Sequence, residues 1–133
     1  MRYRRYRPSA GAARRTAREL ARQWGVGCLA EDLALVVSEL VTNAIVHGRA
    51  PAGSRVVVTY RLRDDDVLHV DVRDFATGLP ATGPRPACDE GGRGLPIVDA
   101  LTDRWGVLPH VVGKSLWFEM SVPPAAPGAG HPG

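Results

Sequence analysis

The sequence of 133 residues lacks several features that would point to particular classes of protein. It has no apolar run of transmembrane length, and its start, MRYRRYRPSAGAARR, has no apolar segment of the signal-peptide kind. It holds only two cysteines, Cys28 and Cys88, which have neither metal-binding nor redox spacing. We therefore expect a cytoplasmic protein without a membrane segment, in which both thiols are reduced and structural.

Lysine is also scarce, because Lys114 is the single lysine and the other basic residues are arginines. The net charge of +3 is unevenly placed: residues 1–22 carry eight Arg and one Glu, and the remainder sums to −4. A solvated arm followed by an exposed helix face is the simplest interpretation, and contact with an acidic protein surface or nucleic acid is the alternative. The sequence has no recognisable nucleic-acid module, so it does not favour nucleic acid as a partner.

Hydrophobic spacing predicts two helices, two strands, a long loop, a short helix and two further strands. The helices should span residues 12–24, 31–47 and 95–105, and the strands 55–63, 67–74, 105–112 and 114–122. This order is typical of an α+β fold, a two-layer α/β sandwich in which helices cover one face of a mainly antiparallel sheet. We place this domain at residues 12–122, between a basic N-terminal arm, 1–11, and a disordered tail, 123–133.

The stretch SELVTNAIVHG, residues 38–48, places Glu39, Asn43 and His47 at every fourth position of an otherwise apolar helix. Successive members lie only ~40° apart around the axis, and Ser38 and Thr42 remain as the solvent face. Glu and Asn oxygens are hard ligands that suit Mg²⁺ or a polarised water. On its own, however, the stripe favours polar side chains bonded to neighbouring backbone.

A second motif is VRDFATGLP, in which a strand ends at Asp74 and the chain turns through Gly78 and Pro80. An aspartate at such a position can accept a hydrogen bond from an exocyclic amine while the backbone packs on an aromatic base. An aspartate that caps a turn is the common alternative. Alone, this motif does not decide between the two.

A third motif, EGGRGLPIVDAL, places Gly91, Gly92 and Gly94 around Arg93, just before a helix with Pro96 in its first turn. Glycines let the backbone approach a ligand closely, and the free N–H groups at a helix N-terminus attract phosphate. The motif therefore favours an anion site over an ordinary loop-to-helix junction.

In this order and spacing, the motifs resemble those of the Bergerat-type (GHKL) ATP-binding fold, which gyrase, Hsp90 and histidine kinases share. ELVTNAIVHG looks like its N box, DFATG its G1 box, GRGLPIV its G2 box, and GKSLWFEM its terminal Gly-Lys-Ser/Thr strand. The resemblance covers about residues 12–122. It is closest to the stand-alone anti-sigma-factor serine/threonine kinases.

The resemblance implies that ATP and Mg²⁺ are bound and assigns a role to each motif. Asn43 would coordinate Mg²⁺ at the ATP phosphates, and Glu39 would be the catalytic base that takes a proton from the attacking hydroxyl or water. Asp74 would accept a hydrogen bond from the adenine amino group. The other implied nucleotide contacts are His47 near the phosphates or in packing, Gly78 against the adenine, Leu79 at the start of a lid over residues 79–91, Gly92, Arg93, Gly94 and Leu95 at the phosphate oxygens, and Ser115 near the adenine.

The resemblance further implies a kinase that phosphorylates an antagonist (anti-anti-sigma) protein of the STAS type and sequesters a sigma factor, through Mg²⁺-assisted phosphoryl transfer. One departure is Ala76, at the first glycine of the usual Asp-x-Gly-x-Gly pattern, which favours a nucleotide-dependent partner-binding module without turnover as the alternative. A histidine-kinase catalytic domain is a third interpretation, although helix 12–24 holds no phosphoacceptor histidine. For the homodimer that the family suggests, we expect the alanine-rich face of helix 12–24 to be the contact.

Overall fold

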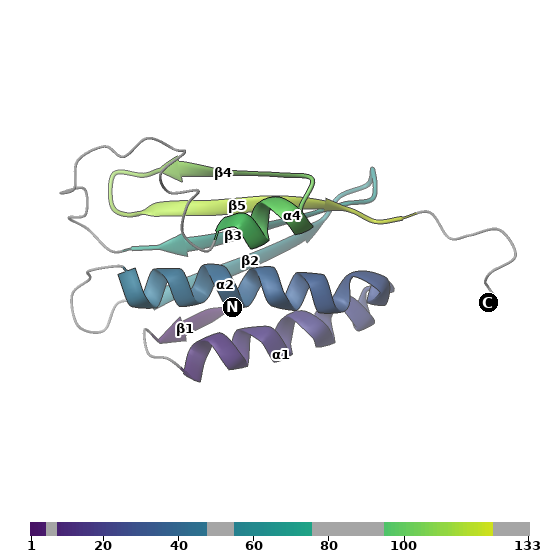
Figure 1. Cartoon of the computed structure of the whole chain (residues 1–133), viewed down its shortest axis with the longest axis horizontal. Helices are drawn as coiled ribbons and strands as arrows, with labels where there is room; N and C mark the ends of the chain where they lie inside the picture. Colours follow the sequence, from purple (N-terminus) through teal and green to yellow (C-terminus); the bar gives the residue numbers. More distant parts are fainter. Residues whose placement is uncertain (5–7, 48–54, 76–94, 124–133) are drawn as a thin grey trace, which may run out of the picture.

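A computed structural model describes residues 1–4, 8–47, 55–75 and 95–123. They form a sheet with the strand order β1-β2-β3-β5-β4, in which every described pairing is antiparallel, and the helices cover one of its faces (Figure 1). The elements are β1 (Arg2–Arg4), α1 (Pro8–Gln23), the 3-10 turn η1 (Gly27–Leu29), α2 (Ala30–His47), β2 (Arg55–Leu62), β3 (Val67–Asp74), α4 (Leu95–Leu101), β4 (Arg104–Pro109) and β5 (Lys114–Ser121). The predicted α+β sandwich is therefore confirmed.

The core lies between this sheet and helix α2. Alternate residues of β3 and β5 face the helix and are almost fully buried, as their period of two requires. The helix contributes apolar residues from most of its circumference, which fits an element that is covered on more than one side. The largest fully buried side chains are Phe118, Leu33, Leu40, Leu68, Val36, Val37, Val41, Val56, Val58, Val70, Val72 and Val98.

Helix α1 packs against α2 and lies beside it on the same side of the sheet, next to β1 (Figure 1). The alanine face that we expected at a homodimer contact is part of this packing, because Ala13, Ala17 and Ala21 are at most 1% exposed. That expectation is wrong, since small side chains here let the two helices approach each other within one chain. Ser38, predicted to face solvent, is likewise buried between these helices and accepts a hydrogen bond from Arg14 Nη2 at 3.0 Å.

The first residues of the chain belong to the sheet. Strand β1 pairs with β2 through Arg2, Tyr3 and Arg4, the Tyr3 side chain is buried, and the Met1 ammonium donates to the Val58 carbonyl at 2.7 Å. Helix α1 also begins at Pro8, a residue suited to the first helical turn. The expectation of a solvated arm over residues 1–11 is therefore wrong for residues 1–4 and 8–11. Strand β1 was missed because three residues are too few to show a periodic pattern. Of the expected tail, residues 124–133 lie outside the described part.

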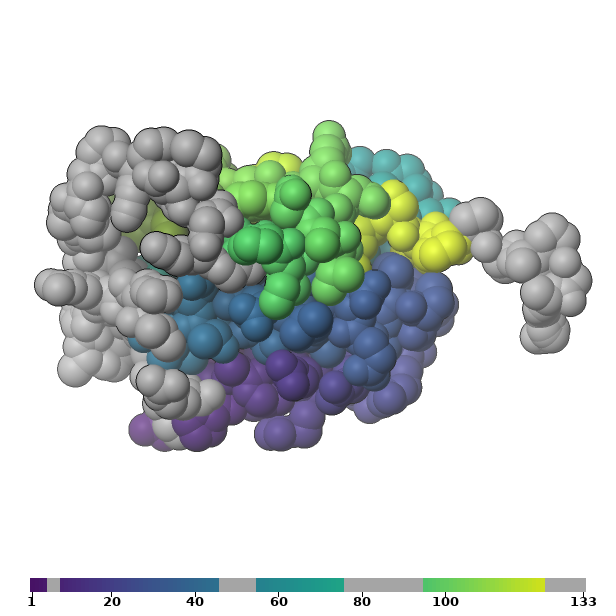
Figure 2. All heavy atoms as spheres, in the orientation of Figure 1, coloured from purple at the N-terminus to yellow at the C-terminus, as the bar shows by residue number. Residues whose placement is uncertain are grey.

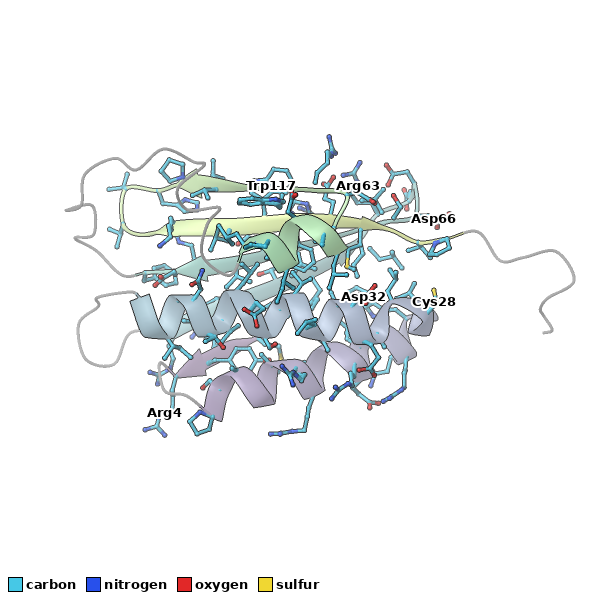
Figure 3. All side chains as sticks on the ribbon, in the orientation of Figure 1. Arg4, Cys28, Asp32, Arg63, Asp66 and Trp117 are labelled. Atoms are coloured by element: carbon cyan, nitrogen blue, oxygen red, sulfur yellow. The ribbon has the colours of Figure 1, made fainter. Side chains whose placement is uncertain are left out.

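The second face of the sheet has no helix on it in the described ranges, and it carries a cluster around Glu119. This carboxylate accepts hydrogen bonds from His69 Nδ1 and Arg63 Nη1, both at 2.9 Å, and from Arg104 Nη2. His69 and Arg104 are the cross-strand neighbours of Glu119 on β3 and β4, so the register of the sheet builds the cluster. Trp117, labelled with Arg63 in Figure 3, stacks on His69 with ring centroids 5.7 Å apart.

Candidate active site

Helix α2 places Glu39 and Asn43 one turn apart, and both are half-buried. The helix begins with Glu31 and Asp32, whose charges favour a helix N-terminus, and neither glycine nor proline interrupts it. Leu40 and Ala44, the residues that follow Glu39 and Asn43, are buried in the core and fix the rotation of the helix. The predicted polar pair therefore lies at the edge of the core and is partly exposed to solvent. His47 ends the helix, and its side chain lies outside the described part.

Strand β3 ends at Asp74, which is 2% exposed. Leu68, Val70 and Val72 precede it on the same face, so the alternation that builds the core also turns the carboxylate toward the helix side of the sheet. The Lys114 ammonium lies 3.7 Å from Asp74 Oδ2 and provides an opposite charge for it. Strand β3 thus ends at Asp74, as predicted, and the carboxylate there is buried on the helix side of the sheet.

Ser115, in contrast, lies on the other face of the sheet. It is the cross-strand neighbour of Arg73, whereas Asp74 is the neighbour of Lys114, and directly paired residues point to the same side. The Ser115 hydroxyl is buried and hydrogen-bonded to His110 Nε2 at 2.8 Å. The structure therefore does not bring Ser115 to Asp74, and the sequence interpretation chose the wrong neighbour. Leu116, Phe118 and Met120 alternate on the core side of β5. Extending this alternation back by two residues could have identified Lys114 as the neighbour of Asp74.

Helix α4 begins at Leu95, which is buried, and it packs on α2. Figure 2 shows α4 alongside α2 on the viewed surface. The remaining predicted contacts lie outside the described residues: Gly78, Leu79, Gly92, Arg93 and Gly94, together with Ala76 and the expected lid.

The elements that carry the predicted site residues are oriented toward one end of the molecule. The C-terminal end of α2, the end of β3 and the start of β5 lie toward the same end, and α4 begins toward it (Figure 1). No group of three or more His, Cys, Asp or Glu that could hold a metal is found among the described residues. At nucleotide sites Mg²⁺ takes few protein ligands and most of its oxygens from phosphates and water, so a single ligand such as Asn43 fits this way of binding. No helix of the described part is both long and apolar enough to cross a membrane.

Comparison with known proteins agrees with this arrangement. Residues 6–119 match the family model described as "Histidine kinase-like ATPase domain". The chain is 33% identical over 81 residues to an anti-sigma F factor of Lysinibacillus sphaericus, a match that covers 55% of this chain and 56% of that protein. It is 34% identical over 80 residues to an anti-sigma F factor of Geobacillus stearothermophilus, covering 54% and 55%. The chain thus spans about half the length of the curated relatives it matches.

A solved structure extends the likeness to three dimensions. The histidine kinase domain from the Erythrobacter litoralis EL346 blue-light activated histidine kinase has a TM-score of 0.56 and 26% sequence identity to this chain. The match covers 70% of this chain and 44% of that one. The expected resemblance to the GHKL ATP-binding fold is thereby confirmed. With a family model matched over most of its length, this chain belongs to the family of histidine kinase-like ATPase domains.

Proposed function

We propose that the protein binds ATP with Mg²⁺ and works as an anti-sigma-factor serine/threonine kinase in the cytoplasm. The observation that carries the proposal is the half-buried Glu39 and Asn43 pair in the C-terminal half of α2. The C-terminal end of this helix lies toward the same end of the molecule as the end of β3, where the carboxylate of Asp74 is buried (Figure 1). The family supports nucleotide binding, and the names of the relatives support the regulatory role.

Each of these three residues has a role that its chemistry allows. The amide oxygen of Asn43 is a neutral ligand for Mg²⁺, which when bound neutralises charge on the nucleotide phosphates. Glu39, one helical turn earlier, is placed to accept the proton of an attacking hydroxyl, a step worth about 10²–10⁴-fold in rate. Asp74 accepts a hydrogen bond from the exocyclic amine of the adenine. The backbone at Leu95, together with Gly92, Arg93 and Gly94, holds the phosphate oxygens.

The proposed partners are a sigma factor, which the protein sequesters, and a STAS-type antagonist, which it phosphorylates on a serine or threonine. This part rests on likeness to proteins named as anti-sigma F factors, over about half their length. A nucleotide-dependent binding module without turnover is the second candidate. Ala76 favours it, because alanine replaces a glycine of the usual adenine-binding turn.

Calorimetric titration with ADP and a non-hydrolysable ATP analogue, with and without Mg²⁺, tests nucleotide binding. We expect Mg²⁺-dependent binding that is lost or greatly weakened in Asn43→Ala. Thr42→Ala is the matched control, because Thr42 is the exposed neighbour on the same helix and should bind as the unaltered protein does. The absence of binding by a folded, unaltered sample would refute the proposal.

A phosphotransfer assay with candidate STAS-type proteins then separates the two candidates. For the kinase, Glu39→Gln should still bind ADP but lose phosphotransfer by about 10²-fold or more. For the binding module, neither the unaltered protein nor the variant should transfer phosphate, although both bind nucleotide.

A further inference from the structure

Lys114 lies beside Asp74 because of the register of the sheet. Asp74, the last residue of β3, is directly paired with Lys114, the first residue of β5. The next pair on the same face, Val72 and Leu116, lies in the core. Both Asp74 and Lys114 therefore start from the helix side of the sheet. Their side chains differ in accessibility, since that of Asp74 is 3% exposed and that of Lys114 is 44% exposed.

The turn before β5 fixes this pairing. Gly113 has a φ of +79°, and a Cβ added to it would lie 1.9 Å from the Asp74 carbonyl oxygen. The Gly113 backbone thus packs directly on the Asp74 peptide, and any other residue would push the two strand ends apart. The position of Lys114 next to the carboxylate is set by backbone packing rather than by a flexible side chain alone.

The Lys114 ammonium retains the capacity to bind a ligand. Its 3.7 Å distance from Asp74 Oδ2 is that of an ion pair, longer than the 2.7–3.2 Å of a typical N–H···O hydrogen bond. An ammonium has three N–H donors and rotates freely on its stem. At this end of the sheet, the Asp74 carboxylate, an acceptor, and the Lys114 ammonium, a donor, thus lie side by side.

We infer that Lys114 and Asp74 together read the base of the nucleotide. In adenine, the exocyclic amine is a donor flanked by ring nitrogens that are acceptors, and this is the complement of a carboxylate beside an ammonium. Asp74 accepts from the amine, and Lys114 donates to a neighbouring ring nitrogen, N1 or N7. This inference rests on the proposed function, and it assigns base recognition to Lys114 in place of Ser115.

A ligand series provides the test. Binding of ADP, 1-deaza-ADP and 7-deaza-ADP, each with Mg²⁺, is measured by calorimetry for the unaltered protein and for Lys114→Met. The variant should bind ADP roughly 10-fold more weakly, and the analogue that lacks the contacted nitrogen should bind the unaltered protein more weakly by a similar factor. The two losses should not add, because both remove the same hydrogen bond. Lys114→Arg, which keeps a donor, should recover part of the affinity.

Arg61→Met is the matched control, because it removes one exposed positive charge from β2 at the far end of the sheet and should leave ADP binding unchanged. Equal ADP affinity in Lys114→Met and the unaltered protein would overturn the inference. It would also be overturned if, for both 1-deaza-ADP and 7-deaza-ADP, the loss of affinity caused by the analogue simply added to the loss caused by Lys114→Met. If the unaltered protein bound no ADP at all, the proposed function would fail as well, so the two failures are distinguishable.

Discussion

Replacing Glu119 by glutamine tests whether the cluster around it, on the sheet face that no described helix covers, stabilises the fold. The glutamine side chain keeps the shape of Glu119, but it removes the charge and directs an NH₂ group at one of the three donors, His69, Arg63 or Arg104. An ionised carboxylate accepts hydrogen bonds and donates none. In the glutamine variant, each of these bonds therefore loses either its charge assistance or its acceptor.

The magnitude follows from the exposure of the partners. Arg63 and Arg104 are 40% and 67% exposed, so each bond to Glu119 contributes only about 0.5 kcal/mol. The bond from His69, which is 22% exposed, to a carboxylate that is 8% exposed contributes roughly 1 kcal/mol. We therefore expect Glu119→Gln to lower the free energy of unfolding by about 2 kcal/mol, or Tm by roughly 6–10 °C for a domain of this size.

The effect must also depend on pH. The hydrogen bond from His69, followed by that from Arg104, lowers the pKa of Glu119 below its ordinary value of 4.5. A carboxylate with a lowered pKa stabilises the fold fully above its unfolded pKa, and it loses this contribution as the pH falls through the folded pKa. The difference in stability between the unaltered protein and Glu119→Gln should therefore be complete at pH 7 and shrink below about pH 4.5.

Urea or thermal denaturation at pH 7 and at acidic pH measures both effects. Glu31→Gln is the matched control, because Glu31 is 72% exposed and bonded only to Arg18 in the described part, so its loss should cost at most about 0.5 kcal/mol. A Glu119→Gln protein as stable as the unaltered one at pH 7 would refute the reasoning. A difference that did not change on acidification would refute the linkage to the Glu119 carboxylate.

Two further substitutions test the turn and the core. Gly113→Ala should weaken ADP binding and lower Tm, because a Cβ there would meet the Asp74 carbonyl and the backbone has a positive φ; unchanged ADP affinity and Tm would contradict the close packing. Phe118→Ala should reduce the free energy of unfolding by about 3–5 kcal/mol, measured by urea denaturation, because this fully buried ring would leave a cavity between α2 and the sheet. A loss below 1 kcal/mol would show that the core refills around it.

The fold could be predicted from the sequence because its main elements repeat a strong pattern. The strand at 67–74 alternates cleanly, the strand at 55–62 is rich in β-branched residues, and the three aspartates between them form the expected hairpin, in which Asp66 adopts a φ of 62°. Helix α2 was expected from 31 to 47 and spans Ala30–His47. Strand β1 was missed because three residues show no period, and its pairing depends on where β2 lies in space.

The candidate site was predictable in part. The roles of Glu39, Asn43 and Asp74 followed from the resemblance of their motifs to the GHKL fold and stay predictions, and the structure places the three residues on the expected elements. Ser115 was chosen because it resembles the threonine of related proteins, whereas its orientation is decided by the register between β3 and β5. Register is a property of the assembled sheet, and a short motif does not encode it.

The position of β5 has a consequence for how the protein is made. This strand, the last of the described strands in sequence, lies between β3 and β4 and pairs with both along its length. While the chain emerges from the ribosome, β3 and β4 therefore have no common neighbour, and the ammonium that faces Asp74 is not yet in place. In the inferred base site, Asp74 and Lys114 come together only when β5 pairs with β3, so a nucleotide cannot act as a template for the early nascent chain. A ribosome stalled before Lys114 should therefore hold a chain that ADP does not protect from proteolysis.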